Sequence, residues 1–108
     1  MKTILITGFG PFPGVAQNPT AALARNLHGK KLGDVRFVGV VLPVSYRRAP
    51  QQTLAVAAAY KVDAILGMGV ATSRSDAMVE ARGRWIPESH VDVEGQTLTL
   101  LDGPAEVA

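Results

Sequence analysis

The chain contains no cysteine among its 108 residues. Disulfide bonds, thiolate metal sites and a cysteine nucleophile are therefore excluded within it. Aromatic residues make up only 6% and charged residues 19%, against 47% hydrophobic residues, and this balance is typical of a folded globular domain. No apolar run approaches the length of a membrane span. The formal net charge of +2 is too small to predict binding to nucleic acid.

The N-terminus lacks the features of a secretory signal, because Met1-Lys2 leads directly into a short apolar stretch. We therefore expect a cytoplasmic protein that needs no metal and no cofactor. Its length favours one α/β domain that spans residues 1–108.

A loop rich in glycine and proline, from Thr7 to Gly14, organises the sequence. Asn18-Pro19 after it predicts the start of a helix, with Asn18 as the N-cap. Phe9 and Phe12 in this loop have two interpretations. They fill the end of the core, or their rings line a small apolar pocket at the end of the first strand. The spacing of the glycines fits a dinucleotide fingerprint and a Walker loop poorly, which leaves nucleotide binding as a minor hypothesis.

The alternation of apolar patterns predicts the fold. The expected strands and helices, in chain order, are a strand at 2–7, a helix at 19–27, a strand at 34–42, a helix after Ser45 and a strand at 62–66. Such a βαβαβ start predicts a three-layer α/β/α fold with a mainly parallel sheet and right-handed crossovers. Residues 90–100 then predict a C-terminal β-hairpin that turns at Glu94-Gly95.

Two details of the helices follow from the same patterns. Leu23 and Leu27 are expected to face the core from the first helix. In the second helix the expected buried residues are Leu54, Ala57 and Ala58, and Pro50 is tolerated only in the first turn.

The opening segment closely resembles a known family. Thr7-Gly8-Phe9-Gly10-Pro11-Phe12-Pro13-Gly14, followed by Asn18-Pro19, is similar to the start of pyroglutamyl peptidase I, a family of soluble cysteine peptidases that remove N-terminal pyroglutamate from peptides. Later matches to the family pattern are Gly67-Met68-Gly69, Arg74, Glu80, Ile86-Pro87 and Glu94-Gly95. The resemblance covers essentially the whole chain but only the N-terminal half of the family, so the fold is expected to be incomplete relative to it.

The resemblance implies roles for particular residues. Glu80 would be the catalytic carboxylate that orients a histidine in a Cys-His-Glu arrangement. Phe9 and Phe12 would hold the flat lactam ring, and the backbone of Gly69, Val70 and Ala71 would bind its polar edges. From the residues alone, the simpler interpretation of Glu80 is an ordinary carboxylate paired with Arg74 or Arg82.

The sequence also departs from the family pattern. Trp85 stands where the family has an arginine thought to support the oxyanion, and Arg84 is the displaced candidate for that role. The family's cysteine and histidine belong to a half that this sequence lacks, and neither His28 nor His90 matches a family motif. We expect His28 to interact with the dipole at the end of the first helix.

Two hypotheses from different classes follow. In the first, the chain carries the pocket for a peptide with N-terminal pyroglutamate, or for free pyroglutamate, and is inactive alone. In the second, it is a non-catalytic, truncated half-domain that self-associates as a homo-oligomer or complements another chain, because absent strands leave sheet edges exposed.

Overall fold

The computed structural model describes residues 1–71, 76–80, 83–84, 91–96 and 106–107. Its helices and strands, in chain order, are β1 (Lys2–Phe9), α1 (Pro19–Leu27), β2 (Lys31–Leu32), β3 (Val35–Leu42), α2 (Arg48–Tyr60), β4 (Ala64–Gly67), β5 (Gly83–Arg84) and β6 (Glu106–Val107). The predicted α/β class is confirmed, and the first helix has the predicted bounds.

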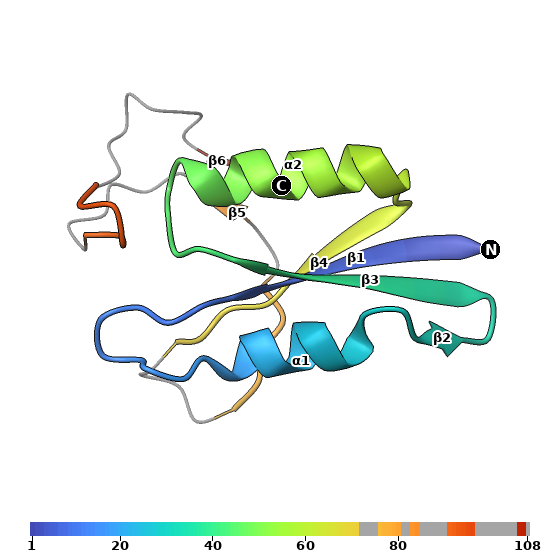
Figure 1. Ribbon diagram of the computed structural model, residues 1–108, viewed down its shortest axis with the longest axis horizontal. Coiled ribbons are helices and arrows are strands. Elements are labelled where there is room, and N and C mark those ends of the chain that lie inside the picture. Colours follow the sequence, from blue (N-terminus) through green and yellow to red (C-terminus); the bar gives the residue numbers. More distant parts are fainter. Residues whose placement is uncertain (72–75, 81–82, 85–90, 97–105, 108) are drawn as a thin grey trace.

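One sheet contains the first four strands, in the order β2-β3-β1-β4. β1 pairs in parallel with β3 and with β4, whereas the short β2 pairs antiparallel with β3. Figure 1 shows α1 on one face of this sheet and α2 on the other, which is the expected three-layer arrangement. β5 and β6 form a separate antiparallel pair. The carboxyl ends of β1, β3 and β4 consequently lie at one edge of the sheet, which is where open α/β sheets bind ligands.

α1 lies close against the sheet because two glycines face it. A Cβ added at Gly39 would overlap the carbonyl oxygen of Ala24, and one added at Gly8 would overlap that of Thr20. Ala24 is fully buried, whereas Leu23 is 50% exposed. The prediction that Leu23 faces the core is therefore wrong, since only small side chains fit beneath a helix at this separation.

α2 buries a different face from the predicted one. Pro50 does lie in the first turn, where its missing N–H removes no helical hydrogen bond. Ala49 is buried, but Leu54 is 68% exposed and Ala58 is exposed as well. Those two predictions are wrong because α2 packs mainly on β3 and β1, so that none of the described strands lies beneath the outer part of its apolar face. Ala57 is half-buried.

The residues of β4 are exposed to solvent although the sequence of this strand is apolar. It lies at the edge of the four-stranded sheet and pairs with β1. All four of its residues are exposed, with Ile65 at 50% and Leu66 at 54%. A continuous apolar run is typical of a parallel strand covered on both faces. The β4 edge therefore leaves apolar side chains uncovered that a complete sheet of this kind would bury.

The predicted C-terminal hairpin is described only at its turn. Residues 93–95 form a turn in which Gly95 adopts a φ of 77°. The Gly95 amide donates to the Asp92 carbonyl at 3.1 Å, and the Asp92 amide donates to the Gln96 carbonyl at 2.9 Å. The turn is at the predicted Glu94-Gly95. The described residues next to it, 91, 92 and 96, are not in a strand, and the rest of the predicted hairpin, 90 and 97–100, lies outside the described residues.

Candidate functional site

Asn18 and Thr20 hold the loop after β1 against the start of α1. Oδ1 of Asn18 accepts hydrogen bonds from the amide and the hydroxyl of Thr20, at 3.1 and 2.7 Å, and Nδ2 donates to the Gly10 carbonyl at 3.2 Å. The Thr20 hydroxyl also accepts from the Phe9 amide at 2.8 Å. The predicted N-cap is confirmed, and the same two side chains fix the segment that carries Phe9.

A groove opens between this loop and α2, and we call it the α2-side groove. It has a volume of about 580 Å³, which lies within the range of small-molecule sites. Its lining comes from the ends of β1, β3 and β4 and from the first turns of α2: Thr7, Phe9, Leu42, Ala49, Pro50, Thr53, Leu54 and Gly67 to Gly69. The groove is mainly apolar, and the half-buried Phe9 supplies its one aromatic ring among these residues.

A second groove, the α1-side groove, lies on the α1 side of β4. Its volume is about 720 Å³, and Gly67, Met68 and Gly69 line both grooves. The other lining residues come from α1, from β4 and from two segments after β4: Thr20, Leu23, Ile65, Leu66, Val70, Ala71 and residues 76–80. This groove combines apolar walls with the carboxylates of Asp76 and Glu80.

The residues that the resemblance placed in one site line two adjacent grooves, which share Gly67, Met68 and Gly69. Phe9 lines the α2-side groove, whereas Val70, Ala71 and Glu80 line the α1-side groove, and Gly69 lines both. Phe12 is half-buried and lines neither of these grooves. Its backbone pairs with Val15 across a tight turn, with hydrogen bonds of 3.0 and 2.8 Å.

The remaining predicted residues are described only in part. Glu80 is exposed, and it has an interaction partner in the structure. Arg84 belongs to β5. The alternative partners of Glu80, Arg74 and Arg82, lie outside the described residues, as does His90.

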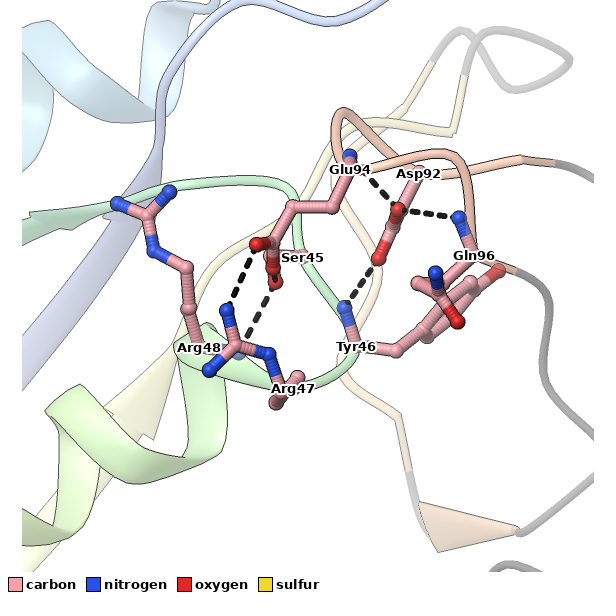
Figure 2. A network of polar contacts seen from close by, with 7 residues as sticks. All are labelled: Ser45, Tyr46, Arg47, Arg48, Asp92, Glu94 and Gln96. Atoms are coloured by element: carbon pink, nitrogen blue, oxygen red, sulfur yellow. Dashed lines mark hydrogen bonds and ion pairs between the residues drawn. The ribbon is translucent and has the colours of Figure 1, made fainter.

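A polar network that the sequence analysis did not foresee joins the turn at residues 92–96 to the segment before α2 (Figure 2). Tyr46 donates its amide to Asp92 Oδ2 at 2.8 Å, and the Val93 amide donates to the Val44 carbonyl at 2.9 Å. The Ser45 hydroxyl donates to Glu94 Oε1. The partners in each of these pairs are 46 to 49 residues apart in the sequence. The turn itself could therefore be predicted from the local sequence, but the residues that it contacts could not.

The two acids of this network have lowered pKa values. Burial acts to raise the pKa of Asp92, but hydrogen bonds from the amides of Gln96, Tyr46 and Glu94 outweigh it and leave the pKa below its usual value. For Glu94, the hydrogen bond from Ser45 and then the one from Arg47 lower the pKa. The Arg47–Glu94 ion pair measures 2.8 Å, and its arginine side chain is 62% exposed. Solvent therefore screens the attraction between the two charges of this pair, and the hydrogen bonds do most to hold the network in place.

Neither a metal site nor a membrane span is found in the part of the chain that the structure describes. No group of three or more His, Asp or Glu side chains there is arranged to hold a metal ion, and no helix there combines the length and hydropathy needed to cross a bilayer. His28 lies at the C-terminus of α1, as expected, and its Nδ1 accepts a hydrogen bond from the Gly39 amide at 3.0 Å.

A mainly parallel sheet between two helices, with grooves at the carboxyl ends of its strands, defines an α/β protein of the kind that binds small ligands at that edge. The chain belongs to the pyroglutamyl peptidase family, whose model matches residues 2–99.

Curated relatives support this assignment. The chain is 38% identical over 80 residues to a pyrrolidone-carboxylate peptidase of Thermococcus litoralis, a match that covers 74% of this chain and 36% of that protein. It is 31% identical over 110 residues to one of Bacillus thuringiensis subsp. konkukian, which covers 97% of this chain and 51% of that protein. The chain therefore spans about half the length, or less, of the relatives that it matches.

Solved structures agree with the sequence matches. The Thermococcus litoralis pyrrolidone carboxyl peptidase superposes with a TM-score of 0.87 at 32% identity, covering 98% of this chain and 50% of that one. A Pyrococcus furiosus pyrrolidone carboxyl peptidase superposes with a TM-score of 0.83 at 33% identity, covering 89% of this chain and 47% of that one. This arrangement of strands and helices thus corresponds to about half of each relative's chain.

Proposed function

We propose that this chain forms the pyroglutamate-binding part of a cysteine peptidase that removes N-terminal pyroglutamate from peptides. The family match over residues 2–99 carries the proposal. Its ligands are a peptide that begins with pyroglutamate, or free pyroglutamate. A cytoplasmic location belongs to the same proposal.

In this proposal Phe9, the last residue of β1, and Phe12, from the loop that follows, hold the lactam ring. An apolar groove of about 580 Å³ beside Phe9 supports this role, because a small ring with two polar edges needs an apolar wall and a few hydrogen-bonding groups. Gly69 lines this groove and supplies one of those groups from its backbone, and Val70 and Ala71, which line the adjacent α1-side groove, supply the others from beside the shared Gly67 to Gly69 segment.

Glu80 has the role of orienting and charging a histidine that this sequence does not supply, and Arg84 supports the developing oxyanion. Peptide hydrolysis of this kind needs a thiolate nucleophile, and the sequence has no cysteine. The chain alone is therefore inactive as a peptidase.

Titration of the ¹⁵N-labelled chain with pyroglutamic acid, followed by NMR, tests the pocket. We expect shifts at Phe9 and Gly69 to Ala71, and a loss of affinity of about tenfold in Phe9→Ala, since the ring would provide most of the apolar contact. Phe12→Ala should weaken binding less. Tyr60→Ala is the matched control, because it removes an exposed aromatic ring at the far end of α2.

The same preparations test catalysis with the methylcoumarin amide of pyroglutamate. We expect no release of the fluorophore by the isolated chain. Saturable turnover by the chain alone would contradict the assigned roles, and absence of any binding would contradict the pocket.

The second candidate function is that of a half-domain that self-associates or complements another chain. The exposed, apolar edge strand β4 favours it, because open edges pair with other strands. The two candidates are compatible, since a pocket-bearing half can also be an assembly partner.

A further inference from the structure

We propose that Asp92 and Glu94 are positioning residues that set the first turn of α2, and through it one wall of the α2-side groove. The inference rests on the proposed function only in taking pyroglutamate as the ligand of that groove. The placement of α2 itself depends on contacts within the chain.

The first step is the order within the turn. Oδ1 of Asp92 accepts the amides of Glu94 and Gln96, at 2.8 and 2.9 Å, while Oδ2 accepts the amide of Tyr46 at 2.8 Å (Figure 2). The Asp92 carboxylate thus stabilises its own turn and holds the segment before α2 by a hydrogen bond. Asp92 is only 7% exposed, so that loss of its charge would weaken the acceptor of three oriented amides, and in Asp92→Asn the side-chain NH₂ would face at least one of these donors.

The second step leads from Glu94 to the helix. Its Oε1 accepts from the Ser45 hydroxyl, and its Oε2 accepts from the Arg47 guanidinium at 2.8 Å. Ser45 also accepts the first helical amides: its hydroxyl takes that of Arg48 at 2.9 Å and its carbonyl takes that of Ala49 at 3.1 Å. Glu94 therefore holds Ser45, whose hydroxyl and carbonyl accept the amides of the first two residues of α2.

The third step is the charge at the helix N-terminus. The N-cap residue Arg47 makes no capping hydrogen bond with its side chain, and the first turn of α2 contains no acidic residue. Carboxylates stabilise a helix N-terminus through its dipole. Asp92 and Glu94 supply that negative charge from a remote turn, in addition to the hydrogen bonds that Ser45 accepts at this end of the helix.

The fourth step is the groove. Ala49, Pro50 and Thr53, from the first two turns of α2, line the groove that also contains Phe9. A shift of the first turn would move this wall relative to Phe9, which is anchored separately through Thr20. Affinity for a small rigid ring is sensitive to such a change.

The pH dependence has a definite sign. Both acids have pKa values lowered in the folded chain, with Arg47 facing both of them and Arg48 facing Glu94. Their contribution is therefore complete at neutral pH and is lost as the pH falls through their lowered, folded-state pKa values in the acid range.

The test compares Asp92→Asn and Glu94→Gln with the control Asp34→Asn. Asp34 is exposed and lies just before β3, at the amino end of the parallel strands and away from the carboxyl ends that border the grooves. Amide hydrogen exchange is measured by NMR at Tyr46, Arg48 and Ala49, with the α1 amide of Ala24 as an internal reference. Pyroglutamic acid is then titrated into each protein. We expect exchange about tenfold faster at the start of α2 in the two variants, with little change in α1. We also expect several-fold weaker binding, and no effect in Asp34→Asn.

Unchanged exchange at the start of α2 and unchanged affinity would overturn the proposal. If either variant fails to fold, acid titration of the unmodified chain tests the same proposal. We then expect the protection of the Ala49 amide from exchange to fall over the same pH range in which the chemical shift of the Tyr46 amide changes. The proposal would also be overturned if the Ala49 amide stayed protected at a pH low enough to complete the change in the Tyr46 chemical shift. Failure of the unmodified chain to bind pyroglutamic acid would count against the proposed function alone, because hydrogen exchange still reports on the placement of α2.

Discussion

At the scale of single residues, Gly8 and Gly39 decide how the first helix meets the sheet. Each faces a carbonyl of α1 so closely that a Cβ would lie nearer than 3.0 Å to backbone atoms. Backbone of a packed helix cannot move aside as the end of a long side chain can. These glycines therefore set the distance between α1 and the strands β1 and β3.

Gly39→Ala should destabilise the chain by more than about 2 kcal/mol, because the added methyl group forces α1 away from the sheet. Gly69→Ala is the matched control: a Cβ there meets no atom of the described residues within 4 Å. Urea denaturation followed by circular dichroism measures both. Equal midpoints for the two variants would contradict the close packing described for α1.

At the scale of elements, Asn18 connects a helix start to a binding loop. Its Oδ1 caps α1 through Thr20, while its Nδ2 reaches the Gly10 carbonyl. A residue that served only as an N-cap would leave the loop unaffected when replaced. Asn18 is 7% exposed, so that its removal leaves buried groups without partners.

Asn18→Ala should cost about 1–2 kcal/mol of unfolding free energy through the lost cap. It should also speed hydrogen exchange at the Phe9 amide, since Thr20 loses the partner that orients its hydroxyl. Asn26→Ala is the control, because Asn26 is exposed on the same helix and alanine has the higher helix propensity. Thermal and urea unfolding of both variants check the difference, and an Asn18→Ala protein as stable as Asn26→Ala would contradict this role.

At the scale of the whole molecule, the incomplete cover of β4 is the main feature. The strand pairs on one side with β1 and leaves Ile65 and Leu66 about half exposed. The relatives that share this fold are about twice as long as this chain. Exposed apolar side chains on an open edge favour association with another strand.

We expect the isolated chain to form a homo-oligomer through β4, measurable by light scattering during size-exclusion chromatography. Ile65→Lys should shift the chain toward the monomer, because a lysine on an edge strand opposes pairing. Leu32→Lys is the control, since Leu32 is 73% exposed at the opposite edge of the sheet, on β2. A monomer at every concentration, or an equal effect of both lysines, would contradict association through this edge.

The sequence predicted the order of strands and helices better than it predicted which faces are buried. Branched apolar runs and the Asn18-Pro19 start are local features, so they identified β1, α1 and β3 nearly to the residue. Leu23 and Leu54 were assigned to the core from spacing alone, yet they are 50% and 68% exposed. Spacing defines a stripe on a helix but does not reveal which part of the stripe has a strand beneath it.

The candidate site was predictable to a similar extent. The loop with Phe9 and Phe12 stood out from its composition, and Phe9 does line a groove at the carboxyl edge. The partners of Asp92 and Glu94 were not predictable, because Ser45 and Tyr46 are more than 45 residues away and come near only once β3 and α2 are in place.

The sequence by itself determined the class of fold, the position of the glycine- and proline-rich loop and the absence of a thiol nucleophile, because each of these depends on local pattern or on composition. The tertiary structure alone decided that small residues seat α1, that Phe9 and Glu80 line different grooves, and that a remote turn anchors the start of α2. These features depend on which surfaces meet across the sheet, and that is set by packing over long sequence separations.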